Sequence, residues 1–155
     1  MGQEVTVLSN PDGFDIDLFL AGVARLGELD VASVDAMVQA VSNQVQGDLI
    51  TRLNIVGHGS AASFSVGNDE VMVINFDQFY PSLRKLSYKF DARGFVHLQQ
   101  CETGQCIPLL VKLAQAVQVP VYAGTGDENP VYHFNWGKYV YATPDGSSGS
   151  LPSRP

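Results

Sequence analysis

Apolar positions along the chain follow two spacings, one typical of strands and one typical of helices. Short, mostly apolar runs predict buried strands at residues 5–8, 53–56, 94–98 and 119–123. Apolar residues three and four positions apart predict two helices, one beginning after Ser33 and one near Ile107. Gly47 is placed to end the first of these helices. Strands that alternate with helices predict an α/β fold, here a three-layer α/β/α sandwich whose mainly parallel sheet is covered on both faces.

Less regular segments complete the expected architecture. They are a helix from Asp15 or Asp17 to about Leu26, a β-hairpin over residues 63–74, a helix over 76–90 that contains Pro81, and an aromatic-rich hairpin over 132–143 around Gly137. Residues 1–145 are expected to form one domain. Residues 146–155 are rich in Gly, Ser and Pro, and they predict a flexible tail.

Charge and composition exclude several classes of function. The 155 residues are 45% hydrophobic and carry a formal net charge of −7, so no concentrated basic face for nucleic acid is expected. No apolar run approaches the ~18 to 20 residues that cross a bilayer. The N-terminal residues lack the basic start of a signal peptide, which favours a cytoplasmic protein, although secretion without a leader would leave no sequence signal. Two cysteines exclude a disulfide scaffold and a four-cysteine zinc site.

A histidine and a cysteine follow two of the predicted strands. His58 comes just after the strand at 53–56, and Cys101 just after the strand at 94–98. Neighbouring parallel strands lie ~5 Å apart and end on one edge of the sheet, where ligands of such folds bind. A cysteine nucleophile needs a nearby base, so we expect Cys101 and His58 to form a catalytic dyad. The N–H groups of Gly59 and Cys101 are candidates for an oxyanion hole.

Simpler interpretations of these residues stay open. In the simpler interpretation, His58 only makes a hydrogen bond that caps a strand end. Cys101 is then only a small buried side chain. Cys106 is expected to be a packing cysteine, and His97 a packed or surface strand residue. His133 is expected to be structural.

Other chemistry is weakly supported by the sequence. A Cys101–Cys106 redox pair lacks the Cys-x-x-Cys spacing, and zinc binding by these cysteines with His58 lacks a fourth ligand. A serine nucleophile elbow at Ser60 would need glycine at position 62, where Ala62 stands. The acidic pair 127–128 is either a solvated loop or a means of selecting substrate charge at the sheet edge. We expect no metal and no cofactor.

The segments around the histidine and the cysteine resemble the caspase-like cysteine peptidase superfamily, clan CD. The matching strings are Ile55-Val56-Gly57-His58-Gly59-Ser60 and Gln99-Gln100-Cys101-Glu102-Thr103-Gly104. The second is similar to the CHAT type of bacterial caspase-like domain, and the wider layout over residues 5–126 resembles a short bacterial domain of the same superfamily. The resemblance implies a caspase-hemoglobinase fold, a His58–Cys101 dyad and a thioester intermediate. It departs from the caspase box because the glycine falls three residues after the cysteine and no arginine adjoins it.

These observations predict a cysteine endopeptidase that acts on an extended protein or peptide substrate. The resemblance implies that Gln99, two residues before the cysteine, lines the substrate pocket. Gly124 and Thr125, in the loop after Ala123, are further candidates for that pocket. The biological role implied by the resemblance is a bacterial effector, toxin or defence protease. The alternatives are a catalytically inactive relative that binds a protein partner, and a structural module with a buried cysteine. The oligomeric state stays open.

Overall fold

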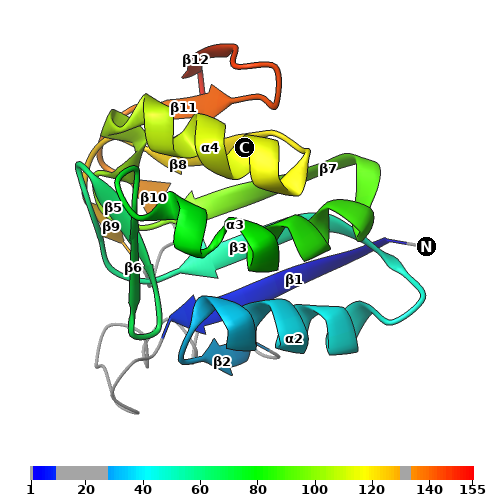
Figure 1. Cartoon of the computed structure of the whole chain (residues 1–155). Helices are drawn as coiled ribbons and strands as arrows, with labels where there is room; N and C mark the ends of the chain where they lie inside the picture. The colour runs from blue at the N-terminus through cyan, green and yellow to red at the C-terminus, as the bar shows by residue number, and fades with distance from the viewer. Residues whose placement is uncertain (1, 10–27, 130–133) are drawn as a thin grey trace.

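A computed structural model describes residues 2–9, 28–129 and 134–155, and a seven-stranded sheet lies at its centre (Figure 1). The strand order is β12-β11-β8-β7-β3-β1-β2. The strands are β1 (Gly2–Ser9), β2 (Leu29–Val31), β3 (Leu49–Val56), β7 (Phe90–Gln99), β8 (Val121–Gly124), β11 (Tyr139–Ala142) and β12 (Ser148–Leu151). The pairings from β2 to β8 are parallel, whereas β11 is antiparallel to β8 and to β12. The predicted α/β class with a mainly parallel sheet is therefore confirmed.

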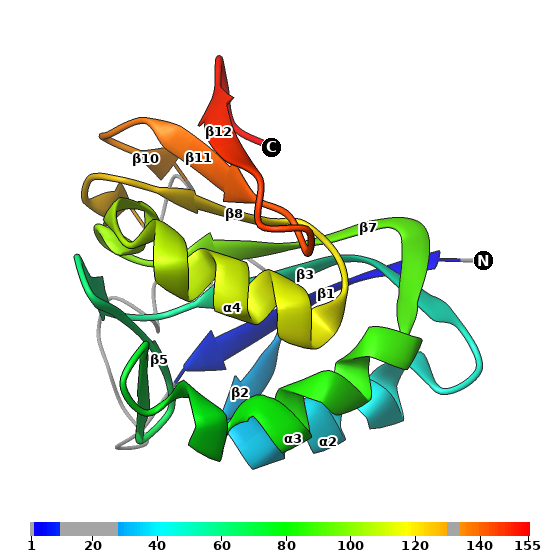
Figure 2. The same ribbon diagram turned by 45° about the horizontal axis from the view of Figure 1, so that its top comes forward.

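In the described part of the chain, the α-helices α2 (Val34–Val45), α3 (Tyr80–Arg84) and α4 (Ile107–Val117) lie on the same face of this sheet (Figures 1 and 2). The apolar stripe of α2 is buried, and its N-terminus is capped by Ser33, whose Oγ accepts a 3.0 Å hydrogen bond from the Ala36 N–H. The residue that ends α2 is Gln46, with φ of 48°, one position before the glycine predicted for that role. Helices α2 and α4 confirm the prediction from helical spacing. No helix in the described part of the chain is long and apolar enough to span a membrane.

The helix predicted over residues 76–90 is wrong in its length. The segment forms the 3-10 turn η1 (Phe76–Gln78), the short helix α3 and a second 3-10 turn, η2 (Lys85–Tyr88), before Phe90 begins β7. Pro81 lies in the first turn of α3, because proline has no N–H to continue a preceding helix. The helix expected between Asp15 and Leu26 lies outside the described residues.

A second, three-stranded sheet is formed by β4 (Gly59–Ser60), β5 (Ser63–Val66) and β6 (Asp69–Met72). It contains the predicted hairpin, and its tight turn is at Gly67, which has φ of 62°. A Cβ at Gly67 would lie 2.0 Å from the Ala32 backbone, so only glycine fits there. The Gly67 N–H donates to Ser9 Oγ at 2.6 Å, and the Val34 N–H donates to Asp69 at 2.8 Å. The hairpin is thereby fixed to the carboxyl end of β1 and to the N-terminus of α2.

The C-terminal third differs from the sequence prediction in two ways. The predicted hairpin around Gly137 is wrong, since β10 (Phe134–Asn135) pairs with β9 (Glu128–Asn129), and β11 pairs with β8 and β12. The predicted flexible tail is also wrong where Ser148–Leu151 forms the edge strand β12. A Cβ at Gly149 would lie 2.7 Å from the Tyr141 hydroxyl oxygen, so small residues suit a strand packed this closely against an aromatic ring.

Candidate active site at the carboxyl ends of the strands

The chain segments that carry His58 and Cys101 are in contact. Strands β3 and β7 are parallel neighbours, and Val56 lies opposite Gln99. The Gly57 N–H continues this pairing with a 3.4 Å hydrogen bond to the Gln99 carbonyl. A Cβ at Gly59 would lie 2.9 Å from the Cys101 carbonyl oxygen, so these backbones touch. The predicted meeting of the two strand ends is confirmed, whereas the contact of imidazole with thiol and the oxyanion hole of Gly59 and Cys101 stay predictions.

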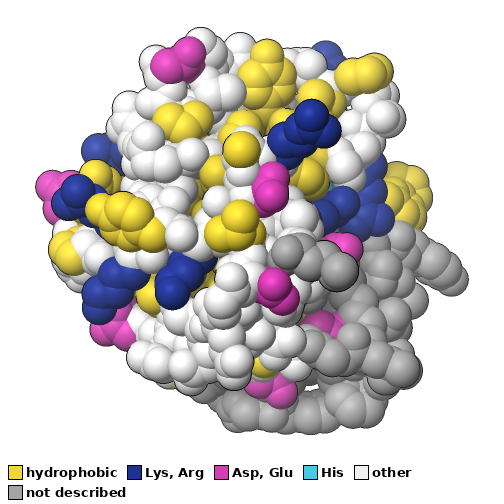
Figure 3. Space-filling view, turned by 90° about the vertical axis from the view of Figure 1, so that its right-hand side faces the viewer, with side chains coloured by type: hydrophobic (Ala, Val, Ile, Leu, Met, Phe, Trp, Pro, Cys, Tyr) yellow, Lys and Arg dark blue, Asp and Glu magenta, His cyan; other side chains and the backbone are white. Residues whose placement is uncertain are grey.

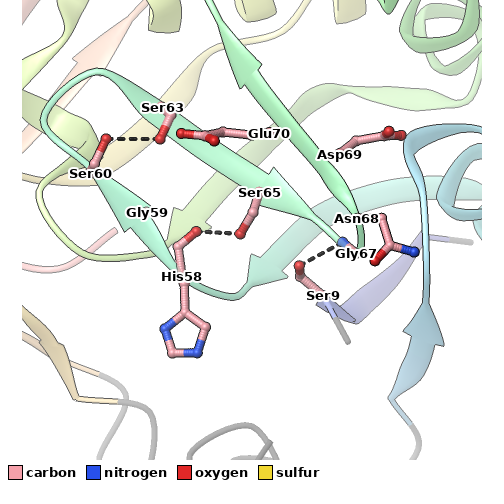
Figure 4. A pocket seen from close by; sticks show the side chains of 10 residues that line it. All are labelled: Ser9, His58, Gly59, Ser60, Ser63, Ser65, Gly67, Asn68, Asp69 and Glu70. Atoms are coloured by element: carbon pink, nitrogen blue, oxygen red, sulfur yellow. Dashed lines mark hydrogen bonds between the residues drawn. The ribbon is translucent and has the colours of Figure 1, made fainter. Parts of the chain in front are cut away.

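We use the name rim for four segments at the carboxyl edge of the sheet. Residues 57–60, 99–104 and 124–128 lie at the ends of β3, β7 and β8, and residues 67–70 include the hairpin turn that is bonded to the end of β1. In the rim, His58 is exposed, and its carbonyl accepts a hydrogen bond from the Ser65 hydroxyl. Figure 4 shows its imidazole pointing away from the side chains of Ser60, Ser63 and Ser65. The backbone of the histidine is therefore held by the hairpin while its ring stands at the surface.

Gln100 joins the hairpin to the turn that contains the cysteine. Its side chain is fully buried, its Oε1 accepts from the Ser65 N–H at 2.8 Å, and its Nε2 donates to the Ser65 carbonyl at 2.8 Å. The amide thus bonds to Ser65 as a neighbouring strand would. A second link comes from the Thr103 hydroxyl, which donates to the Ser63 carbonyl at 3.0 Å. Neither contact follows from a periodic pattern of apolar residues in the sequence.

The Cys101 thiol is half-buried beneath the loop that follows β8. Its Sγ accepts from the Glu128 N–H at 3.3 Å, and the Glu102 N–H donates to the Gly126 carbonyl at 2.8 Å. Burial raises the pKa of the Cys101 thiol, and the nearby charges of Asp127, Glu128 and Glu102 raise it further, although the Glu128 N–H opposes them. The resting cysteine is therefore a neutral thiol at pH 7.

Asn135 holds this loop in place. Its Oδ1 accepts from the Gly126 N–H at 2.9 Å and from the Gly137 N–H at 2.8 Å. Its Nδ2 donates to the Gly126 carbonyl at 2.8 Å and to Glu128 Oε2 at 2.9 Å. Because one side chain binds both Gly126 and Glu128, Asn135 sets the position of the Glu128 N–H that donates to the sulfur. This residue was missed by the sequence analysis, which treated residues 132–143 as a hairpin.

We expect alkylation of Cys101 to follow its raised pKa. The thiolate is the reacting form, so labelling by iodoacetamide should be slow at pH 7 and should keep rising above the pH at which a free cysteine has already ionised. Asp127→Asn removes one raising charge and should increase the rate at pH 7. The measurement is the rate of labelling against pH, located by peptide mass mapping.

The control for this experiment is Asp77→Asn, which removes the same charge from an exposed residue of η1. It should leave the labelling rate unchanged. A rate that reaches its plateau below the pH expected for a free thiol would contradict the raised pKa.

The residues predicted to line the substrate pocket make contacts within the fold. Gln99 is only 2% exposed, and its amide donates to Asn54 Oδ1 at 3.0 Å on the polar face of the sheet. Gly124 is covered by Asn135, since a Cβ on the glycine would lie 2.0 Å from the asparagine Cγ. The Thr125 hydroxyl accepts from the Lys138 N–H at 2.9 Å. That these three residues line a substrate pocket stays a prediction.

An open cleft of about 420 Å³ lies between the hairpin and the end of β1, and His58 is one of its lining residues (Figure 4). It is lined by Ser9, His58, Gly59 and hairpin residues that include Asp69 and Glu70. Ser9 binds the hairpin turn, so this wall of the cleft is fixed by the fold. The cleft therefore offers a preformed site next to the histidine.

The other titratable candidates take structural positions. Cys106 is a free cysteine packed against the core, as predicted. His97 is fully buried, as predicted for a packed strand residue, with its Nδ1 2.8 Å from Arg52 Nη2. His133 lies outside the described residues. Within residues 2–9, 28–129 and 134–155, no group of three or more His, Cys, Asp or Glu is arranged to hold a metal ion.

No protein-family model and no curated protein matches the chain. The class of protein that the structure defines is a mixed α/β fold with a mostly parallel seven-stranded sheet.

Proposed function

We propose that the protein is a cysteine endopeptidase with a caspase-like α/β fold, in which Cys101 is the nucleophile and His58 the general base and acid. The observation that carries the proposal is the contact of Gly59 with the Cys101 carbonyl at the ends of two neighbouring parallel strands. Parallel sheets bind their ligands at this edge, and the cleft beside His58 leaves room for a substrate side chain.

The reaction proceeds through two acyl transfers. His58 takes the proton of the Cys101 thiol as the sulfur attacks the scissile carbonyl, and the N–H groups of Gly59 and Cys101 stabilise the oxyanion. The C–N bond then breaks, the amine leaves with the proton held by His58, and a thioester remains. Water, deprotonated by His58, hydrolyses the thioester and restores the thiol. Because the resting thiol is neutral, its proton moves during the attack instead of being lost beforehand.

The proposal is tested by a peptide-library cleavage profile of the full chain. We expect wild-type protein to cleave, and Cys101→Ala and His58→Ala to lose activity by at least about a hundredfold. The matched control is Cys106→Ala, which removes the chain's other thiol and should keep activity. Intact-mass measurement of rapidly quenched reactions should show an acylated protein in wild type and none in Cys101→Ala. Absence of cleavage in the folded wild type, or full activity of Cys101→Ala, would refute a cysteine peptidase.

The acidic surroundings of Cys101 favour one alternative, a catalytically inactive domain that binds a protein partner at the same rim. A nearby carboxylate disfavours the thiolate, which suits binding better than nucleophilic attack. In that case peptides bind equally to wild type and to Cys101→Ala, and neither protein cleaves them. The cleavage profile therefore separates the two candidates.

A further inference from the structure

The rim segments contain carboxylates and no Lys or Arg of their own, and Lys138 adjoins them through backbone hydrogen bonds with Thr125. The acidic residues of the rim are Asp69, Glu70, Glu102, Asp127 and Glu128. Figure 3, which views the right-hand side of Figure 1, shows Lys and Arg side chains interspersed with Asp and Glu, whereas β1, β3 and β7 end on the left of Figure 1. The potential at the rim is therefore negative, which attracts cations and disfavours anions.

Part of this negative charge lines the cleft beside His58. Its volume of about 420 Å³ accommodates one long side chain, and two of its lining residues are Asp69 and Glu70. Asp69 is fixed by the 2.8 Å hydrogen bond from the Val34 N–H at the start of α2. Glu70 is exposed on β6 and lies opposite Ser65 in the hairpin. No Lys or Arg is among the described residues that line the cleft.

We propose that this cleft binds a lysine or arginine side chain of the polypeptide substrate, and that Glu70 is the main residue that selects it. This inference rests on the proposed function, because it makes the cleft a subsite of the same reaction. The serine hydroxyls along the hairpin supply oxygen acceptors that suit ammonium or guanidinium groups. An acidic substrate side chain would instead meet carboxylates, so the same cleft rejects it.

Binding and cleavage are measured separately to test the subsite. Full-length Cys101→Ala protein is titrated with fluorescent peptide mixtures that share neutral flanking residues and differ at one position, set to Lys, Arg, norleucine or Glu. We expect Lys and Arg peptides to bind about tenfold more tightly than the norleucine peptide at low salt, with the difference shrinking as ionic strength rises. Glu peptides should bind more weakly than norleucine peptides.

Glu70→Gln in the same Cys101→Ala background should reduce the Lys-over-norleucine preference about three- to fivefold and leave norleucine binding unchanged. The matched control Asp77→Asn removes an equal charge outside the cleft and should leave the preference intact. Equal binding of Lys and norleucine peptides, no peptide binding at all, or equal losses in the two variants would overturn the subsite.

The cleavage arm separates this inference from the proposed function. If the wild-type protein cleaves peptides without a preference for Lys or Arg, the peptidase proposal stands and the proposed subsite is refuted. If the wild-type protein binds Lys and Arg peptides with the Glu70-dependent preference but cleaves none of them, the proposed subsite stands and the peptidase proposal is refuted.

Discussion

Replacing Gln100 by leucine is expected to lower the free energy of unfolding by about 2–4 kcal/mol and peptide cleavage by at least about a hundredfold. The variant keeps the buried volume roughly constant but removes both hydrogen bonds to Ser65. The Ser65 N–H and carbonyl are then left without the partner that now satisfies them. Because Ser65 also holds the His58 carbonyl, the histidine loses its fixed position relative to the cysteine. Denaturant unfolding and steady-state kinetics measure the two effects.

Gln115→Leu is the matched control for this experiment, since Gln115 is an exposed residue of α4. It should change stability by less than about 0.5 kcal/mol. A positioning role for Gln100 further requires that kcat falls more than KM rises in the part of the protein that remains folded. Faster hydrogen exchange at the Ser65 amide should accompany the loss. Unchanged kcat in folded Gln100→Leu would reduce Gln100 to a purely structural residue.

The parts of the fold that the sequence predicted well are those in which one buried face repeats regularly. In α2, the apolar stripe from Val34 to Val45 packs against one core, and β3 and β7 each contain a short, mostly apolar run. The Gly/Ser-rich strand β12 has no such pattern, because its formation depends on pairing with β11. Short-range periodicity carries no information about that partner. The segment from Phe76 to Tyr88 forms three short pieces and not the single predicted helix, and the local reason is the proline within it.

The location of the candidate site was predictable because both chemical groups follow strands, and neighbouring parallel strands end together. Its surroundings were not, because they depend on side-chain contacts with distant backbone. Gln99 and Gln100 illustrate the limit. One amide turns to the polar face of the sheet and bonds to Asn54, whereas the next bonds to a hairpin 35 positions away in sequence. The two residues have identical side chains, so only the fold decides which one serves the site.

Gly59→Ala should separate the two segments of the site while sparing the rest of the fold. The new Cβ would lie 2.4 Å from Thr103 Oγ1 and 2.9 Å from the Cys101 carbonyl oxygen, so β4 and the cysteine turn must move apart. We expect a loss of about 1–3 kcal/mol of stability and a fall in kcat of roughly a hundredfold, because reacting groups displaced by about 1 Å lose their alignment. Thermal unfolding and single-turnover kinetics measure these changes.

Gly47→Ala provides the matched comparison, because a Cβ there has no heavy atom within 4 Å and the site lies at the far end of α2. It should leave kcat unchanged. If Gly59→Ala retained wild-type kcat, the close approach of β4 to the cysteine turn would have no bearing on catalysis. If both variants lost activity equally, the loss would come from removing a flexible glycine and not from the contact of β4 with the cysteine turn. A loss confined to Gly59→Ala ties activity to the backbone contact that brings the histidine and the cysteine to one edge of the sheet.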